Sequence, residues 1–99
     1  RALLYACRTG CDFSGANLNG QSLRGVALTG VDLSGADLRG ADLSDSKLSG
    51  VDLSGAHLEG ARFNGASITG CDLSGVDLSK VDLSNARMSG DKLTPNSMR

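Results

Sequence analysis

Residues 31–44 read VDLSGADLRGADLS, and this stretch decides the fold. A large apolar residue recurs in it every five positions, at Leu33, Leu38 and Leu43. A small residue stands two positions before each leucine and an aspartate one position before it, while Gly35 and Gly40 follow the first two leucines. A period of five fits neither an amphipathic helix, with about 3.6 residues per turn, nor a continuous strand, with a period of about two.

The same five-residue unit fills almost the whole chain of 99 residues. Its central position is large and apolar in seventeen consecutive units: Phe13, Leu18, Leu23, Leu28, Leu33, Leu38, Leu43, Leu48, Leu53, Leu58, Phe63, Ile68, Leu73, Leu78, Leu83, Met88 and Leu93. The register never slips, which excludes chance and indicates a structural repeat.

Strand geometry explains the unit. Residues two apart on an extended chain point the same way, so the small residue and the central residue both point inward, and the chain must turn before the next unit. The third residue of that turn is glycine in thirteen of the seventeen units, which suits a type II turn with positive φ. Asp45, Lys80, Asn85 and Pro95 are the exceptions. Asn and Asp tolerate left-handed geometry, whereas Lys80 predicts a different turn.

Four such corners close a square coil of about twenty residues, and coils stack about 4.8 Å apart. The sequence therefore predicts an all-β solenoid of nearly five coils in one domain. Residues 1–10 are expected to form an N-terminal cap and irregular first coil, with residues 1–5 covering the first layer, because the ends of solenoids need caps. Residues 11–95 are expected to form the solenoid, and residues 96–99 a frayed tail.

Several units, including Ala16-Asn17-Leu18, Ala36-Asp37-Leu38 and Ala41-Asp42-Leu43, resemble those of the pentapeptide repeat family, whose units read A-(D/N)-L-x-x. The resemblance covers residues 11–93 and implies a right-handed quadrilateral β-helix, with the handedness taken from the family. It also implies an interaction domain, since such repeats often serve as one.

Because residues twenty apart stack, the surface divides into four faces. The acidic face comprises residues 11–15, 31–35, 51–55, 71–75 and 91–95, and carries five aspartates against one lysine. The basic face comprises residues 6–10, 26–30, 46–50, 66–70 and 86–90, and carries three cations and no anion. The His57 face comprises residues 16–20, 36–40, 56–60 and 76–80. The Arg62 face comprises residues 21–25, 41–45, 61–65 and 81–85.

The acidic face is predicted to align Asp12, Asp32, Asp52 and Asp72, here called the Asp ladder. Neighbouring carboxylates at coil spacing repel by about 1 kcal/mol, so something must offset the repulsion. Each aspartate could accept hydrogen bonds from nearby turn amides. The ladder could also dock a basic partner, or a cation could bind along it.

Groups that carry chemistry are scarce. His57 is the single histidine and is expected to point outward beside Asp37 and Asp77. We expect no catalytic residues, no metal site and no cofactor, because no His or Cys cluster has ligand spacing and the interior is filled by its own side chains. Net charge −1 argues against direct nucleic-acid binding. No apolar run is long enough to span a membrane.

Three cysteines, Cys7, Cys11 and Cys71, do not make a disulfide framework. Cys11 and Cys71 hold inward positions three coils apart, too far to bridge, and are interpreted as small buried apolar residues. Unpaired cysteines favour a reducing compartment and hence the cytoplasm.

Three functional interpretations follow. The first is a non-catalytic protein-interaction or scaffold module whose contact surface is the Asp ladder. The basic face, on the opposite side, is the alternative contact surface. A homodimer or a flanking domain is expected to cover the open C-terminal coil. The second is a DNA-mimicking inhibitor of a type II topoisomerase such as gyrase. The family's gyrase-binding members are strongly acidic rod-like dimers, whereas this chain is short, near-neutral and without a C-terminal dimerisation helix. The third is ice binding through a hydroxyl file formed by Ser14, Ser34, Ser54, Ser74 and Thr94.

Overall fold

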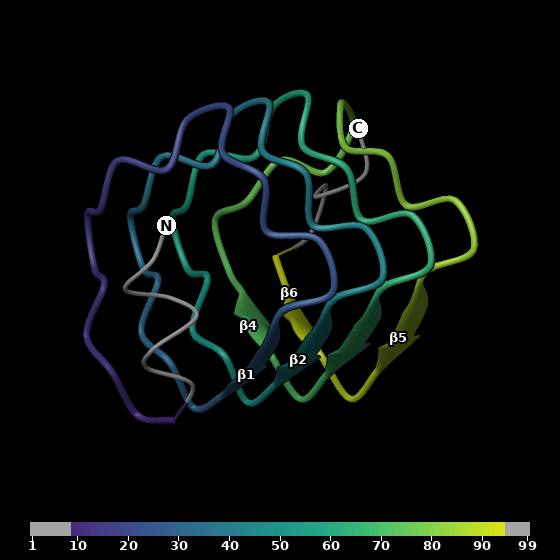
Figure 1. The fold of residues 1–99 in the computed structure, drawn as a ribbon. Coiled ribbons are helices and arrows are strands. Elements are labelled where there is room, and N and C mark those ends of the chain that lie inside the picture. Colours follow the sequence, from purple (N-terminus) through teal and green to yellow (C-terminus); the bar gives the residue numbers. More distant parts are fainter. Residues whose placement is uncertain (1–8, 95–99) are drawn as a thin grey trace.

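The computed structural model describes residues 9–94, which form a right-handed quadrilateral β-helix (Figure 1). Successive coils lie one above another, so that each wall is a stack of short extended segments joined by corners. The prediction of an all-β solenoid is confirmed. The predicted N-terminal cap and C-terminal tail fall mainly in residues 1–8 and 95–99, outside the described residues.

The basic face contains the longest extended segments. β1 (Ala27–Thr29), β2 (Lys47–Ser49), β3 (Ser67–Thr69) and β5 (Arg87–Ser89) form one parallel sheet in that order. The register pairs residues twenty apart, for example Leu28 with Leu48. On the acidic face, β4 (Asp72–Leu73) pairs with β6 (Lys92–Leu93) in the same parallel register. The predicted coil length of twenty residues is therefore correct.

The corners follow the predicted turn chemistry. Their glycines have positive φ, as at Gly35 with φ 66°, and Asp45 and Asn85 adopt the same geometry at 60° and 59°. At three of the four corners a backbone bond closes the turn, as between the Ala36 N–H and the Leu33 carbonyl at 3.1 Å. The corner after the basic face has no such bond in the described chain, so the four corners are not equivalent.

Lys80 differs from the other corner residues, as the sequence predicts. It does not have a positive φ, which excludes a type II turn there. The turn is still closed by the Val81 N–H and the Leu78 carbonyl at 3.2 Å. The Gly60 N–H, however, donates to the Lys80 carbonyl, twenty residues ahead, whereas the Gly40 N–H donates to Glu59, nineteen ahead.

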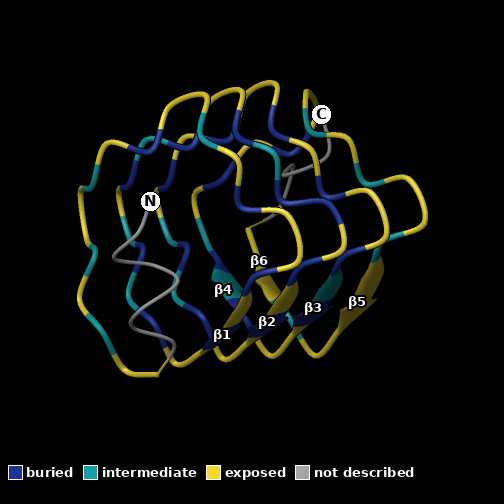
Figure 2. Cartoon of the chain, in the orientation of Figure 1, coloured by how far each residue is buried: buried dark blue, intermediate teal, exposed yellow. Residues whose placement is uncertain are grey.

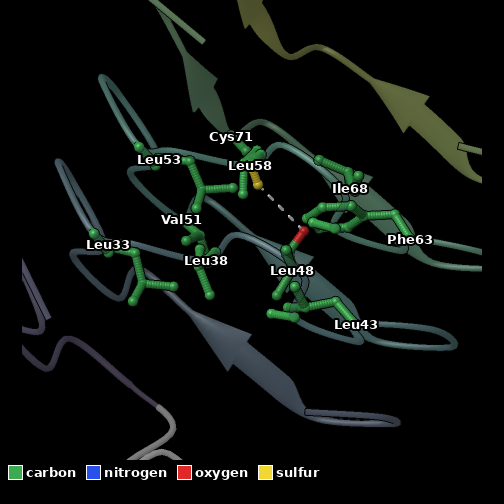
Figure 3. Close-up of a cluster of buried hydrophobic side chains, with 14 of the residues drawn as sticks. Leu33, Leu38, Leu43, Leu48, Val51, Leu53, Leu58, Phe63, Ile68 and Cys71 are labelled. Carbon is green, nitrogen blue, oxygen red and sulfur yellow. Dashed lines mark hydrogen bonds between the residues drawn. The ribbon is translucent and has the colours of Figure 1, made fainter. Parts of the chain in front are cut away.

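The core is the inside of the tube. Most corner residues are exposed, while the central residues from Leu18 to Leu78 are buried (Figure 2). The central leucines stack over one another, and Phe63 and Ile68 lie side by side among them (Figure 3). Ser46 occupies a small inward position and is fully buried, and within the described chain its hydroxyl has no hydrogen-bond partner.

Inward positions in the last described coil are less well buried, and one of them holds a charged residue. Met88 and Leu93 hold inward positions yet are 37% and 45% exposed. Asp91 takes the place of a small residue, and its Oδ1 accepts a bond from the Cys71 N–H at 2.7 Å. Its Oδ2 is buried and has no hydrogen-bond partner among residues 9–94. Asp91 is one of the five aspartates that the sequence assigns to the acidic face. Its carboxylate points inward, so it does not continue the Asp ladder on the outer surface.

The cysteine prediction is wrong in one part. Cys71 is a free thiol that packs inside the core, as expected, and burial raises its pKa. Its Sγ lies 3.5 Å from the Leu48 carbonyl oxygen (Figure 3). Cys11, by contrast, is disulfide-bonded. The argument for a reducing compartment rested on unpaired cysteines and therefore loses its basis.

Candidate interaction surface

The Asp ladder is assembled as the sequence predicts. Parallel bridges join Asp12 to Asp32, Asp32 to Asp52, and Asp52 to Asp72. Asp72 pairs in turn with Lys92 across β4 and β6. The backbone bonds between coils are short, as from the Leu33 N–H to the Asp52 carbonyl at 2.7 Å. These pairings place four carboxylates in one line along a hydrogen-bonded wall.

Each ladder carboxylate is held by the corner that follows it. The Oδ1 of Asp32 accepts the Ser34 backbone N–H at 2.9 Å and the Ser34 hydroxyl at 2.6 Å. The same pair of bonds recurs between Asp52 and Ser54. Asp12 accepts the corresponding bonds from Ser14, and Asp72 accepts the Ser74 backbone N–H. The predicted local hydrogen bonds are thus present, and they lock each side chain in one orientation.

At Asp12 and Asp72 these hydrogen bonds favour the charged form of the carboxylate. The Ser14 hydroxyl, followed by the Ser14 backbone amide, holds the pKa of Asp12 below its ordinary value of 3.8. The Ser74 hydroxyl and amide lower the pKa of Asp72 in the same way. A bond that the ionised form accepts lowers the pKa because protonation weakens it.

The second oxygen of each ladder carboxylate, Oδ2, is not held by the corner that follows it. Every bond recorded for Asp12, Asp32, Asp52 and Asp72 uses Oδ1, and within residues 9–94 none uses Oδ2. Neither do these residues form an ion pair among the described side chains. A row of oriented, charged acceptor atoms is therefore left for an external donor.

The serine file beside the ladder is engaged internally. The hydroxyls of Ser14, Ser34 and Ser54 donate to the adjacent aspartates. The Thr94 hydroxyl oxygen accepts the Gly75 N–H at 2.6 Å. A hydroxyl surface offered to ice would need these groups turned outward, so the geometry gives no support to the ice-binding interpretation.

The sequence interpretation places the basic face opposite the acidic face, and this is wrong. The two faces adjoin. β3 ends one residue before Gly70, and β4 begins two residues after it, so the two faces share that corner. Lys47 and Arg87 project from β2 and β5 and are exposed. Within the described chain they form no ion pair. The surface therefore changes sign across a single edge of the tube.

The other two faces carry aspartates with similar local bonds. Asp42 and Asp82 accept the hydroxyls of Ser44 and Ser84 at 2.6 Å. Asp37 instead binds the Arg39 guanidinium at 2.9 Å, which places its pKa well below the ordinary value. His57 is exposed and pairs in register with Asp37. The predicted neighbour on its other side, Asp77, forms no bridge with it among the described residues.

The Arg62 face contains a polar groove that sequence reasoning missed. It has a volume of about 580 Å³ and is lined by Arg24, Ser44, Asp45, Arg62, Asn64 and Asp82. Arg24 pairs with Asp42 at 3.2 Å and with Asp45 at 3.7 Å. The sequence signal is Asp45, which adds a side chain at a corner where Gly25 and Gly65, one coil away on either side, have none.

The expected absences can be examined over residues 9–94. In this range no group of three His, Cys, Asp or Glu side chains is placed to hold a metal ion. No helix that could cross a bilayer is present in the same residues.

Comparison with known proteins identifies the family. The model for pentapeptide repeats matches residues 9–45 and 46–85, with eight copies. The chain belongs to the pentapeptide repeat family. A crystal structure of a pentapeptide repeat protein from Nostoc PCC 7120 is 27% identical with a TM-score of 0.66, and the match covers 90% of this chain and 87% of that one. No curated protein matches the chain.

Two other solved pentapeptide repeat proteins carry functional descriptions. HetL from Nostoc sp. strain PCC 7120, involved in the regulation of heterocyst differentiation, is 23% identical with a TM-score of 0.58. The match covers 85% of this chain and 43% of HetL, and shows the fold alone. QnrB1, a plasmid-mediated fluoroquinolone resistance protein, is 23% identical, with 88% and 62% of the two chains covered. Its TM-score of 0.37 is too low to bear on this chain.

Proposed function

We propose that this repeat solenoid is a non-catalytic interaction module whose Asp ladder binds a basic surface of a partner protein. The observation that carries the proposal is the state of the ladder carboxylates. Their Oδ1 atoms are fixed by the following corner, while no hydrogen bond within the described chain uses Oδ2. Pre-oriented acceptors lose little entropy on binding, which favours association.

The spacing of the ladder defines the partner chemistry. Coils stack about 4.8 Å apart, so the carboxylates repeat at the distance between neighbouring strands. Lysine or arginine side chains spaced along an extended segment or a helix could meet successive or alternate rungs. Charge-assisted bonds to carboxylate are about twice as strong as neutral ones. The ladder lies at the surface, where Asp12 is exposed and Asp32, Asp52 and Asp72 are half-buried, so binding should weaken as salt is added.

The experiment compares three versions of the chain in affinity capture from a lysate of the source organism. The ladder variant is Asp32→Asn/Asp52→Asn/Asp72→Asn. The matched control is Asp42→Asn/Asp77→Asn/Asp82→Asn, which makes the same change in charge at aspartates that also accept the amide of the serine two residues on. Asparagine keeps an Oδ1 acceptor, so circular dichroism should show both variants folded.

A partner retained by the natural chain and by the control, but lost by the ladder variant, is the expected result. A partner retained equally by all three versions would contradict the proposal. Loss from both variants would show a response to net charge rather than to the ladder, and would also count against it.

Binding to a type II topoisomerase is the alternative candidate. The linear Asp ladder favours it, because a row of negative charge is the feature needed to imitate duplex DNA. The net charge of −1 opposes it, because most of the surface is not acidic. Purified gyrase separates the two candidates: the alternative predicts inhibition of supercoiling by the natural chain and no inhibition by the ladder variant.

The end of the last described coil is a second proposed contact. Met88 and Leu93 are partly exposed there, and exposed apolar side chains at the end of a stack favour association with another surface. We propose a homodimer or a flanking domain at this end. Solution mass by light scattering tests the homodimer, which predicts twice the mass of the monomer.

A further inference from the structure

We infer that residues 76–80, the last described segment of the His57 face, form a strap that opens away from residues 56–60 while the rest of the solenoid stays folded. The evidence is a missing set of backbone bonds in an otherwise regular wall. On this face the Leu38 N–H donates to the His57 carbonyl at 2.8 Å, and the His57 N–H donates to the Ala36 carbonyl at 2.9 Å. One coil further on, no backbone bond joins residues 56–58 to residues 76–78.

The interruption leaves backbone groups on both coils without their usual partners. By register, the Leu58 N–H should meet the Asp77 carbonyl, and the Asp77 N–H should meet the Ala56 carbonyl. Neither bond is present, so two donors and two acceptors lack the backbone partner that their equivalents have one coil earlier. Backbone groups of this kind need partners, and solvent that enters the gap can supply them.

Position at the end of the stack does not explain the interruption. Residues 76–80 are the last described segment on their face, but the last segments on the other three faces are all paired. On the Arg62 face the Asp82 N–H donates to the Ala61 carbonyl at 3.0 Å. On the basic and acidic faces, β5 pairs with β3 and β6 pairs with β4.

The corner residue supplies the cause. Lys80 stands where the other corners use a residue with positive φ, and it does not take that geometry. Its carbonyl consequently receives the Gly60 N–H, one residue out of the usual register. A one-residue slip of this kind breaks the ladder locally, as a β-bulge does.

The strap remains attached by other contacts. Val76 and Leu78 are buried, and the turn bonds at Val76 and Val81 hold the two ends. The β3–β5 pairing lies on the opposite wall and keeps the adjoining coils together. Opening of the strap would therefore expose two apolar side chains without breaking the remaining walls.

Amide hydrogen exchange by NMR under native conditions tests the inference. The amides of Leu58 and Asp77 should exchange at least about tenfold faster than those of Leu38 and His57, their equivalents one coil earlier, because only the latter are hydrogen-bonded across coils. Lys80→Gly should restore the corner and slow both exchange rates to those of the reference amides. Lys80→Ala removes the same charge without favouring positive φ, and should leave the rates fast.

Three results would overturn the inference. Equal protection of Leu58 and Leu38 in the natural chain would show that the wall is closed. Fast exchange in Lys80→Gly would show that the corner residue is not the cause. Strap exchange that rises with denaturant as steeply as global unfolding would show that the strap does not open on its own. None of these results bears on binding by the Asp ladder.

Discussion

The acidic face and the His57 face are built from the same five-residue unit, yet only the acidic face is bonded between coils throughout the described chain. Asp12 connects through successive partners to Lys92 on the acidic face. On the His57 face the pairing runs from Asn17 through Asp37 to His57 and stops. Leu73 on the acidic face and Leu78 on the His57 face are both buried, so burial alone does not close a wall. Closure also requires a corner residue that accepts positive φ.

The largest test of this comparison removes a core side chain from each face. Leu53→Ala on the acidic face should lower the free energy of unfolding by about 3 kcal/mol, because the cavity lies in a wall that cannot collapse. Leu58→Ala should cost less, because the adjacent strap can move inward. Both leucines are 1% exposed, which makes them a matched pair. Urea unfolding gives the two values, and a larger loss for Leu58→Ala would contradict the comparison.

The next test moves the irregular corner to the regular face. Gly75 has φ 75° and closes the acidic face at the coil in which Lys80 lies. Gly75→Lys should destabilise the chain by about 1–2 kcal/mol, since a residue with a Cβ is strained in the left-handed region. Gly55→Lys repeats the change one coil earlier and serves as a control for position. Thermal or urea unfolding measures both, and no loss in either would contradict the role of the corner.

A smaller effect is expected at Ser46, on the continuous basic face. Its buried hydroxyl has no partner, and an unsatisfied polar group in a core costs about 1–3 kcal/mol. Alanine fills the equivalent position at Ala66, one coil further on. Ser46→Ala should therefore raise the free energy of unfolding by about 1 kcal/mol. Ser67→Ala, which changes an outward hydroxyl on the same wall, should have little effect.

The mildest test uses acid. Hydrogen bonds from serine lower the folded-state pKa of Asp12, Asp42, Asp72 and Asp82 below 3.8. Between the folded and unfolded pKa values the unfolded chain binds more protons, so this stabilisation is complete above about pH 4 and is lost as the pH falls further. Melting temperature measured at constant ionic strength should decline over that range. A melting temperature independent of pH below 4 would contradict the assigned bonds.

Much of this structure follows from local rules in the sequence. The five-residue period fixes which residues point inward, and the corner glycines fix where the chain turns. The stacking of Asp32 over Asp12 then follows from a coil of twenty residues. The bonds from serine to aspartate were also predictable, because aspartate two positions before a turn amide commonly accepts from it.

Other features depend on how the coils align in space, which the five-residue pattern alone does not specify. Lys80 predicted an unusual turn, but the effect of that turn on bonds between Leu58 and Asp77 depends on how two coils align. A count of charge by face includes Asp91 as a surface charge, although its position in the unit is inward. The prediction that the basic face lies opposite the acidic face is wrong, because consecutive units share a corner. The Cys11 disulfide contradicts the interpretation of Cys11 as an unpaired residue, whereas Cys71 is free, as its distance from Cys11 in the stack predicts.

The most direct measurement of the central claim is amide exchange at Leu53 in Gly75→Lys. In the natural chain this amide donates to the Asp72 carbonyl at 2.8 Å, and it should exchange slowly. The account predicts that the substitution raises its exchange rate to that of Leu58, while the Leu33 amide, one coil earlier on the same face, stays protected. Continued protection of Leu53 in the folded variant would contradict the claim that the corner residue decides whether a wall is closed.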